Sequence, residues 1–127
     1  MNAAKRRHAI IHANTVAWLV YNQKEYNWLV DLDIHVLHDD QAFILRPDIV
    51  GEDKKEGKFR VFIEISDSTL QKDLNHKLDV YASQNFEFYI VVDCKNEVVK
   101  QFRNVKKEYQ EHEVFRGIDE IFKLGSL

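Results

Sequence analysis

Residues 58–93 read KFRVFIEISDSTLQKDLNHKLDVYASQNFEFYIVVD, and this segment decides the fold. Its first part, 58–66, is a mainly apolar run with β-branched and aromatic residues, which predicts a strand. Leucines at helical spacing then predict a helix over about 69–84. The continuous apolar run at 87–93 is typical of a fully buried strand. We therefore expect a strand, a helix and a second strand along this segment.

A carboxylate, Glu64, lies inside the first of these strands. The aliphatic residues Val61, Ile63 and Ile65 share one face of the strand, and Phe62 shares the other face with Glu64. Neither face has the composition of a solvated surface. Burial of an ionised side chain costs several kcal/mol unless a partner pairs with it. Glu64 therefore either reaches water or has a partner, and we expect it to be at least partly enclosed.

The rest of the chain predicts a second helix and several more strands. The helix covers about 3–22, and its expected buried face consists of Ile10, Ala13, Ala17, Val20 and Tyr21. The further expected strands are 28–37, 42–50, 97–103 and 107–115, with a charged loop at 51–58. The order of helix, three strands, helix and strands indicates one α/β or α+β domain, 1–127, built around a mixed sheet.

Composition restricts the class of protein. The chain of 127 residues is 45% hydrophobic and 31% charged, which is typical of one globular domain. A single cysteine excludes an internal disulfide and favours a reducing cytoplasm. We expect no membrane association, because no apolar run approaches the ~18 residues of a membrane span. The net charge of −3 argues against a generic nucleic-acid binder, but not against a nuclease whose carboxylates bind cations.

A lysine interrupts the apolar stripe of the helix predicted at 69–84. The stripe consists of Leu70, Leu74, Leu78 and Tyr81. At about 100° per residue, Lys77 falls inside this stripe and not opposite it. Its ammonium group needs a carboxylate or a polar pocket, and Glu64 lies on the preceding strand. Asp73 lies at the edge of the stripe, four residues before Lys77, the favoured order for an acid–base pair on a helix.

A second carboxylate, Asp48, follows Pro47 near the end of the apolar strand predicted at 42–50. Carboxylates at the ends of adjacent strands can converge, so Asp48 and Glu64 are candidate partners in one site. Such a pair suits Mg²⁺ or Mn²⁺, which takes a few carboxylates and keeps several waters. The metal polarises a phosphate, and a lysine stabilises the charge that develops on it. Two acids and Lys77 therefore suit phosphodiester hydrolysis.

These residues resemble the Uma family of bacterial restriction-endonuclease-like proteins, part of the PD-(D/E)XK nuclease superfamily. The matching positions are Pro47-Asp48, Glu64-Ile65-Ser66-Asp67-Ser68-Thr69, Asp73, Lys77, Tyr81-Ala82 and Val92-Asp93. The resemblance implies a restriction-endonuclease-like core with a mixed sheet flanked by two helices. It also implies that Asp48 and Glu64 bind the metal. Ser66 occupies the place of the superfamily lysine, and Lys77 takes over that role from the helix.

The function expected from the resemblance is divalent-metal-dependent hydrolysis of phosphodiester bonds, with DNA as partner and Mg²⁺ or Mn²⁺ as cofactor. A homodimer with two sites would suit a duplex, and no organic cofactor is expected. Two other classes remain open: a catalytically inactive module with the nuclease fold that binds nucleic acid or protein, and an assembly protein whose acids only form ion pairs. Ser66 and Asp73 can have purely structural roles, as the start of a loop and as a partner of Lys77.

Other polar residues have competing interpretations. Asp31, Asp33 and His35 alternate like metal ligands, but such a row is more often the solvated face of a strand. His8 matches a histidine found early in the family, although an exposed position near a basic helix start is the simpler interpretation. The last group, Lys54, Lys55, Lys58 and Arg60, could contact a phosphate backbone or form an ordinary solvated loop.

Overall fold

The computed structural model describes residues 3–66, 71–84, 86–96 and 98–116. Along the chain the elements are α1 (Ala3–Asn22), β1 (Tyr26–Val30), β2 (Ile34–His38), β3 (Gln41–Leu45), β4 (Ile49–Asp53), β5 (Phe59–Ser66), α2 (Gln71–Ser83), β6 (Phe88–Asp93), β7 (Val98–Val105) and β8 (Glu108–Arg116). Neither described helix is both long and apolar enough to cross a membrane.

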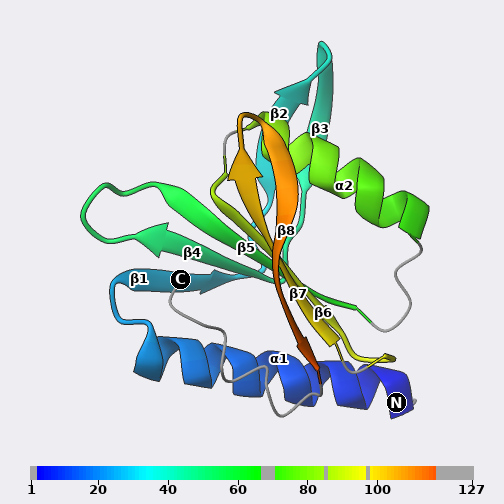
Figure 1. The fold of residues 1–127 in the computed structure, drawn as a ribbon. Helices are drawn as coiled ribbons and strands as arrows, with labels where there is room; N and C mark the ends of the chain where they lie inside the picture. Colours follow the sequence, from blue (N-terminus) through cyan, green and yellow to red (C-terminus); the bar gives the residue numbers. More distant parts are fainter. Residues whose placement is uncertain (1–2, 67–70, 85, 97, 117–127) are drawn as a thin grey trace.

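Six of the strands form one sheet in the order β1-β4-β5-β6-β7-β8 (Figure 1). Only β5 and β6 run parallel, because α2 connects them, and the other neighbours are antiparallel. Strands β2 and β3 form a separate two-stranded hairpin. The predicted mixed sheet with two helices is therefore confirmed, and so are the strand, helix and strand expected over 58–93.

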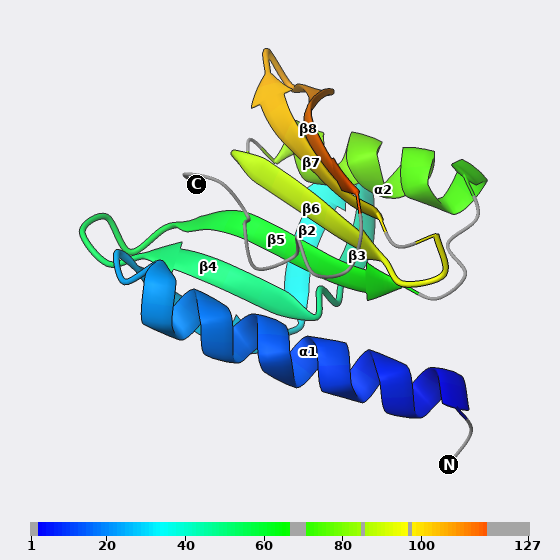
Figure 2. The ribbon, with the colours of Figure 1, turned by 60° about the horizontal axis from the view of Figure 1, so that its bottom comes forward.

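The two helices cover opposite faces of the sheet, as Figure 2 shows. On the α1 side, Ile11 and Leu19 pack with the aliphatic residues of the central strands. On the other side, Val80 and Tyr81 of α2 and the β2–β3 hairpin pack against alternate residues of the same strands. The central strands β5 and β6 are therefore buried on both sides, which explains their nearly continuous apolar sequence.

Helix α1 covers the residues predicted to be helical, but the predicted buried face of this helix was wrong. Ile10, Val20 and Tyr21 are 43%, 55% and 75% exposed. The buried face instead contains Ile11, Thr15 and Leu19. Thr15 is buried at no polar cost because its Oγ1 donates a hydrogen bond to the Ile11 carbonyl at 2.7 Å. The true stripe was missed because it includes threonine and histidine.

Two predicted strands are each divided in the structure. The segment 28–37 breaks at Asp31, whose φ of 56° lies in the left-handed region, so its two halves enter different sheets. The segment 42–50 breaks around Pro47, which cannot donate to a strand ladder. The charged loop expected at 51–58 is shorter than predicted, because β4 continues to Asp53.

Gly51 allows Trp28 to pack closely against the sheet. A Cβ at this position would lie 2.7 Å from Trp28 Cζ3 and 3.1 Å from Val61 Cβ. We expect Gly51→Ala to lower the free energy of unfolding by about 1–3 kcal/mol, because the added methyl overpacks this contact. Urea denaturation measures the change. Gly57→Ala is not a suitable control, because Gly57 has a φ of +65° and an alanine there would strain the backbone. A double variant with Trp28→Leu should recover part of the loss, and no recovery would contradict this explanation.

Candidate active site

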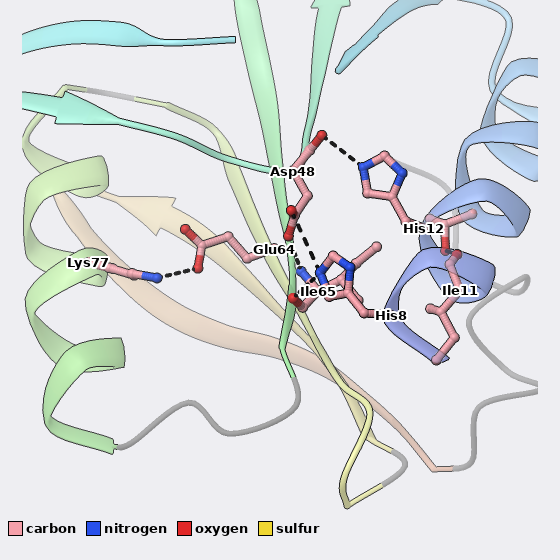
Figure 3. A network of polar contacts seen from close by, with 8 residues as sticks. His8, Ile11, His12, Asp48, Glu64, Ile65 and Lys77 are labelled. Atoms are coloured by element: carbon pink, nitrogen blue, oxygen red, sulfur yellow. Dashed lines mark hydrogen bonds and ion pairs between the residues drawn. The ribbon is translucent and has the colours of Figure 1, made fainter. Parts of the chain in front are cut away.

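Glu64 and Lys77 form an ion pair between the sheet and α2 (Figure 3). Lys77 Nζ lies 2.8 Å from Glu64 Oε2, and the two side chains are 41% and 12% exposed. The position of Lys77 within the apolar stripe correctly predicted that its ammonium group reaches the neighbourhood of Glu64. The pair combines an enclosed carboxylate with a lysine that is still accessible from solvent.

Helix α2 is held in place by aromatic packing one turn beyond Lys77. The Tyr81 ring lies 5.1 Å from the Phe62 ring and 4.7 Å from the Tyr89 ring. Phe62, Tyr81 and Tyr89 are fully buried. Phe62 and Glu64 point to the same side of β5, two residues apart. The packing that fixes Tyr81 therefore also fixes the height of Lys77 above Glu64.

Asp48 lies immediately before β4, at the end of the strand nearest Glu64. The β4–β5 ladder begins with Ile49 paired to Ile63, and Asp48 and Glu64 are the next residues beyond this pair on their two chain segments. The Asp48 carboxylate accepts a hydrogen bond from the Ile65 N–H at 2.7 Å through Oδ2. Its side chain is 29% exposed. The sequence prediction that the two acids lie at neighbouring strand ends is consistent with this register.

Two histidines of α1 approach Asp48 from the side opposite α2 (Figure 3). His8 Nε2 lies 2.9 Å from the Ile65 carbonyl oxygen and 3.8 Å from Asp48 Oδ1. His12 Nε2 lies 3.3 Å from the Asp48 carbonyl oxygen. His8 is thus not the simple exposed residue of a helix start. His12 was not identified from sequence, although its spacing of four from His8 places both on one helix face.

Ser66 and Asp73 have less defined places in this arrangement. Ser66 ends β5 opposite Asp93 of β6, and its carbonyl oxygen accepts a hydrogen bond from the Cys94 N–H at 2.8 Å. Asp73 belongs to α2, but its side chain lies outside the described part of the structure.

The basic residues Lys54, Lys55, Lys58 and Arg60 lie around the β4–β5 turn. This turn is at the opposite end of both strands from Asp48 and Glu64, about 15–20 Å away at 3.3 Å per residue. The structure therefore does not bring these residues to the candidate site.

Arg60 has acidic partners of its own near this turn. Its guanidinium group contacts Asp53, Glu56 and Glu87 at 3.4, 2.7 and 3.4 Å. The hydrogen bond to Glu56 raises the pKa of Arg60, and backbone N–H donors from residues 55 and 56 lower the pKa of Asp53. These contacts stabilise the turn and occupy Arg60.

The alternating residues Asp31, Asp33 and His35 do not form a row of ligands. All three are exposed, as expected for a solvated surface, but the chain breaks between β1 and β2 at this point. Asp33 Oδ1 instead accepts a hydrogen bond from Arg46 Nε at 3.1 Å.

The donor set at Asp48 and Glu64 suits a hard divalent cation. Both groups supply carboxylate oxygens, the ligands that Mg²⁺ and Mn²⁺ prefer. Among the described residues, no group of three or more His, Cys, Asp or Glu side chains is arranged to hold a metal ion. Two carboxylates are compatible with Mg²⁺ all the same, because this ion retains several waters and binds substrate phosphate.

The comparisons with known proteins agree with the fold and with the sequence resemblance. A solved structure from Anabaena variabilis, titled a "putative nuclease belonging to DUF820", superposes with a TM-score of 0.60 and 16% identity, covering 92% of this chain and 80% of that chain. At this identity the likeness shows a shared fold. No curated protein matches the chain. Residues 1–123 match the Uma2 family, described as "Putative restriction endonuclease". The chain therefore belongs to this restriction-endonuclease-like family.

Proposed function

We propose that this protein is a divalent-metal-dependent nuclease that hydrolyses phosphodiester bonds in DNA. The observation that supports this most strongly is the 2.8 Å contact of Lys77 Nζ with Glu64 Oε2. Glu64 follows Ile63, whose partner Ile49 on β4 directly follows Asp48. The Lys77–Glu64 pair and the Asp48 carboxylate therefore lie near the same end of β4 and β5. This set of charges suits metal-assisted hydrolysis of a phosphodiester.

In the proposed site, Asp48 and Glu64 hold Mg²⁺ or Mn²⁺ through their carboxylate oxygens. When bound, the cation polarises the scissile phosphate and makes water a better nucleophile at neutral pH. Lys77 stabilises the negative charge that develops on the phosphate oxygens, since its side chain is 41% exposed and can contact substrate from the solvent side. Enclosure of Glu64 at 12% exposure limits water around its carboxylate and strengthens these charge interactions.

Basic residues at the start of α1 support a polyanionic substrate. Lys5, Arg6 and Arg7 are exposed and directly precede His8, which lies beside Asp48. Lysine and arginine at such positions contact the phosphate backbone and set the register of nucleic acid. The start of α1 is closer to the candidate site than the β4–β5 turn is. We therefore assign contacts with the phosphate backbone of DNA to the basic residues of α1.

Replacement of Lys77 by methionine tests the proposed role of the lysine. We expect Lys77→Met to reduce the rate of plasmid nicking with Mn²⁺ by about 10²–10³-fold, the usual loss when one preorganised donor is removed. Lys58→Met, which removes an exposed lysine at the far end of β5, should keep nearly the full rate. Equal rates for the two variants would remove Lys77 from the mechanism. Metal binding without cleavage by the unmodified protein would favour an inactive binding module.

A further inference from the structure

The ladder between β4 and β5 stops at a proline. The antiparallel register pairs Ile49 with Ile63, so its continuation by two residues would place Pro47 opposite Ile65. In a regular ladder these two residues would exchange two hydrogen bonds. Proline has no N–H, so the Ile65 carbonyl cannot receive its ladder donor from this position.

Two side chains complete the missing part of the ladder. Asp48 Oδ2 accepts the hydrogen bond of the Ile65 N–H at 2.7 Å. His8 Nε2 lies 2.9 Å from the Ile65 carbonyl oxygen. A carbonyl oxygen can only accept, so Nε2 of His8 carries the proton in this contact. The amide and carbonyl groups of Ile65 therefore bind one acid and one imidazole in place of a neighbouring strand.

The same helix face contacts Asp48 at two more points. His8 Nε2 lies 3.8 Å from Asp48 Oδ1, and His12 Nε2 lies 3.3 Å from the Asp48 carbonyl oxygen. The two imidazole rings stack with centroids 6.1 Å apart and an interplanar angle of 26°. Helix α1 therefore reaches the backbone of Asp48, its carboxylate and the strand residue that binds this carboxylate (Figure 3).

We propose that His8 is a positioning residue that fixes the carboxylate of Asp48 for its part in the site. By donating to the Ile65 carbonyl, His8 holds the end of β5, so that the Ile65 N–H keeps its direction toward Asp48 Oδ2. Its proximity to Oδ1 also limits rotation of the carboxylate. The catalytic consequence rests on the proposed nuclease function, whereas the positioning of Asp48 does not.

The test compares His8→Ala with His8→Gln. The amide nitrogen of glutamine occupies a place similar to Nε2 of histidine and can donate to the Ile65 carbonyl, whereas alanine cannot. We expect His8→Ala to lower the hydrogen-exchange protection of the Ile65 amide by about tenfold or more, because a frayed hydrogen bond exchanges through local opening. His8→Gln should retain most of this protection. His35→Ala, which removes an exposed histidine of β2, should leave it unchanged.

The same variants are then assayed for cleavage of plasmid DNA with Mn²⁺. We expect His8→Ala to reduce the rate by about 10–100-fold, as is typical when a partner of a metal-binding side chain is removed, and His8→Gln to recover most of it. Unchanged Ile65 protection in His8→Ala, or equal loss in both variants, would overturn the positioning role. No cleavage by the unmodified protein, with the expected exchange pattern, would instead overturn the nuclease function alone.

Discussion

Replacement of Glu64 by glutamine should abolish detectable cleavage and weaken Mn²⁺ binding by about 100-fold or more. Loss of an outer partner of a metal ligand already costs about 10–100-fold in affinity, so loss of Glu64, proposed as a direct ligand, should cost at least the upper end of that range. Glutamine has the size of glutamate and still accepts a hydrogen bond from Lys77, so the packing around the 12%-exposed side chain is retained. Calorimetric titration with Mn²⁺ measures the affinity, and plasmid nicking measures the activity.

The stability of the Glu64→Gln variant separates a functional role from a structural one. Lys77 is 41% exposed, and ion pairs with an exposed partner contribute little to stability. We therefore expect the free energy of unfolding to change by less than about 1 kcal/mol. Glu52→Gln is the matched control. It removes one carboxylate from the adjacent strand β4 and changes the net charge by the same amount as Glu64→Gln. Unaltered Mn²⁺ affinity together with altered stability would mean that Glu64 forms only an ion pair.

Replacement of Phe62 by alanine should cause the largest loss of stability, about 3–5 kcal/mol. Phe62 is fully buried, and its ring lies 4.1 Å from the Phe86 ring and 5.1 Å from the Tyr81 ring. Removal of the ring leaves a cavity where α2 packs on the sheet. Because Tyr81 positions the helix that carries Lys77, we also expect weaker cleavage in the remaining folded protein. Urea denaturation followed by circular dichroism measures the stability.

Phe59→Ala is the control for this prediction. Phe59 lies on the same strand, but its side chain is only partly buried and its ring lies 6.5 Å from the Phe62 ring. Its truncation should cost clearly less than that of Phe62, because less apolar surface is removed from the core. If the two variants lose equal stability, the aromatic packing at Phe62 is not what anchors α2.

Local periodicity was sufficient to predict the centre of the fold. The strand, helix and strand over 58–93 were identified because buried strands and a helix stripe each have a distinct spacing of apolar residues. The same spacing placed Lys77 on the inward face of the helix, near Glu64, and the structure shows the two side chains in contact. Prediction succeeded where a residue and its partner lie on consecutive elements, since the short connection limits their relative positions.

Prediction failed where a contact depends on distant parts of the chain. His8 and Ile65 are 57 residues apart in the sequence. Nothing near either residue indicates that Pro47, in a third segment, leaves the Ile65 carbonyl without a ladder donor and available to His8. The prediction of the buried face of α1 failed for a similar reason. A threonine and histidines on that face find their partners only in the folded protein, while the aliphatic residues on the other face remain exposed.

The most direct test of the proposed function is the initial rate at which the purified protein nicks supercoiled plasmid in Mg²⁺ or Mn²⁺, measured beside Asp48→Asn. The expected result is nicking by the unmodified protein, loss of nicking when the metal is removed with EDTA, and a rate at least about 100-fold lower for Asp48→Asn. Asparagine keeps the size of the side chain and still accepts from the Ile65 N–H, so the fold is preserved. Equal nicking by both proteins, or nicking that persists in EDTA, would contradict a metal-dependent nuclease site at Asp48 and Glu64.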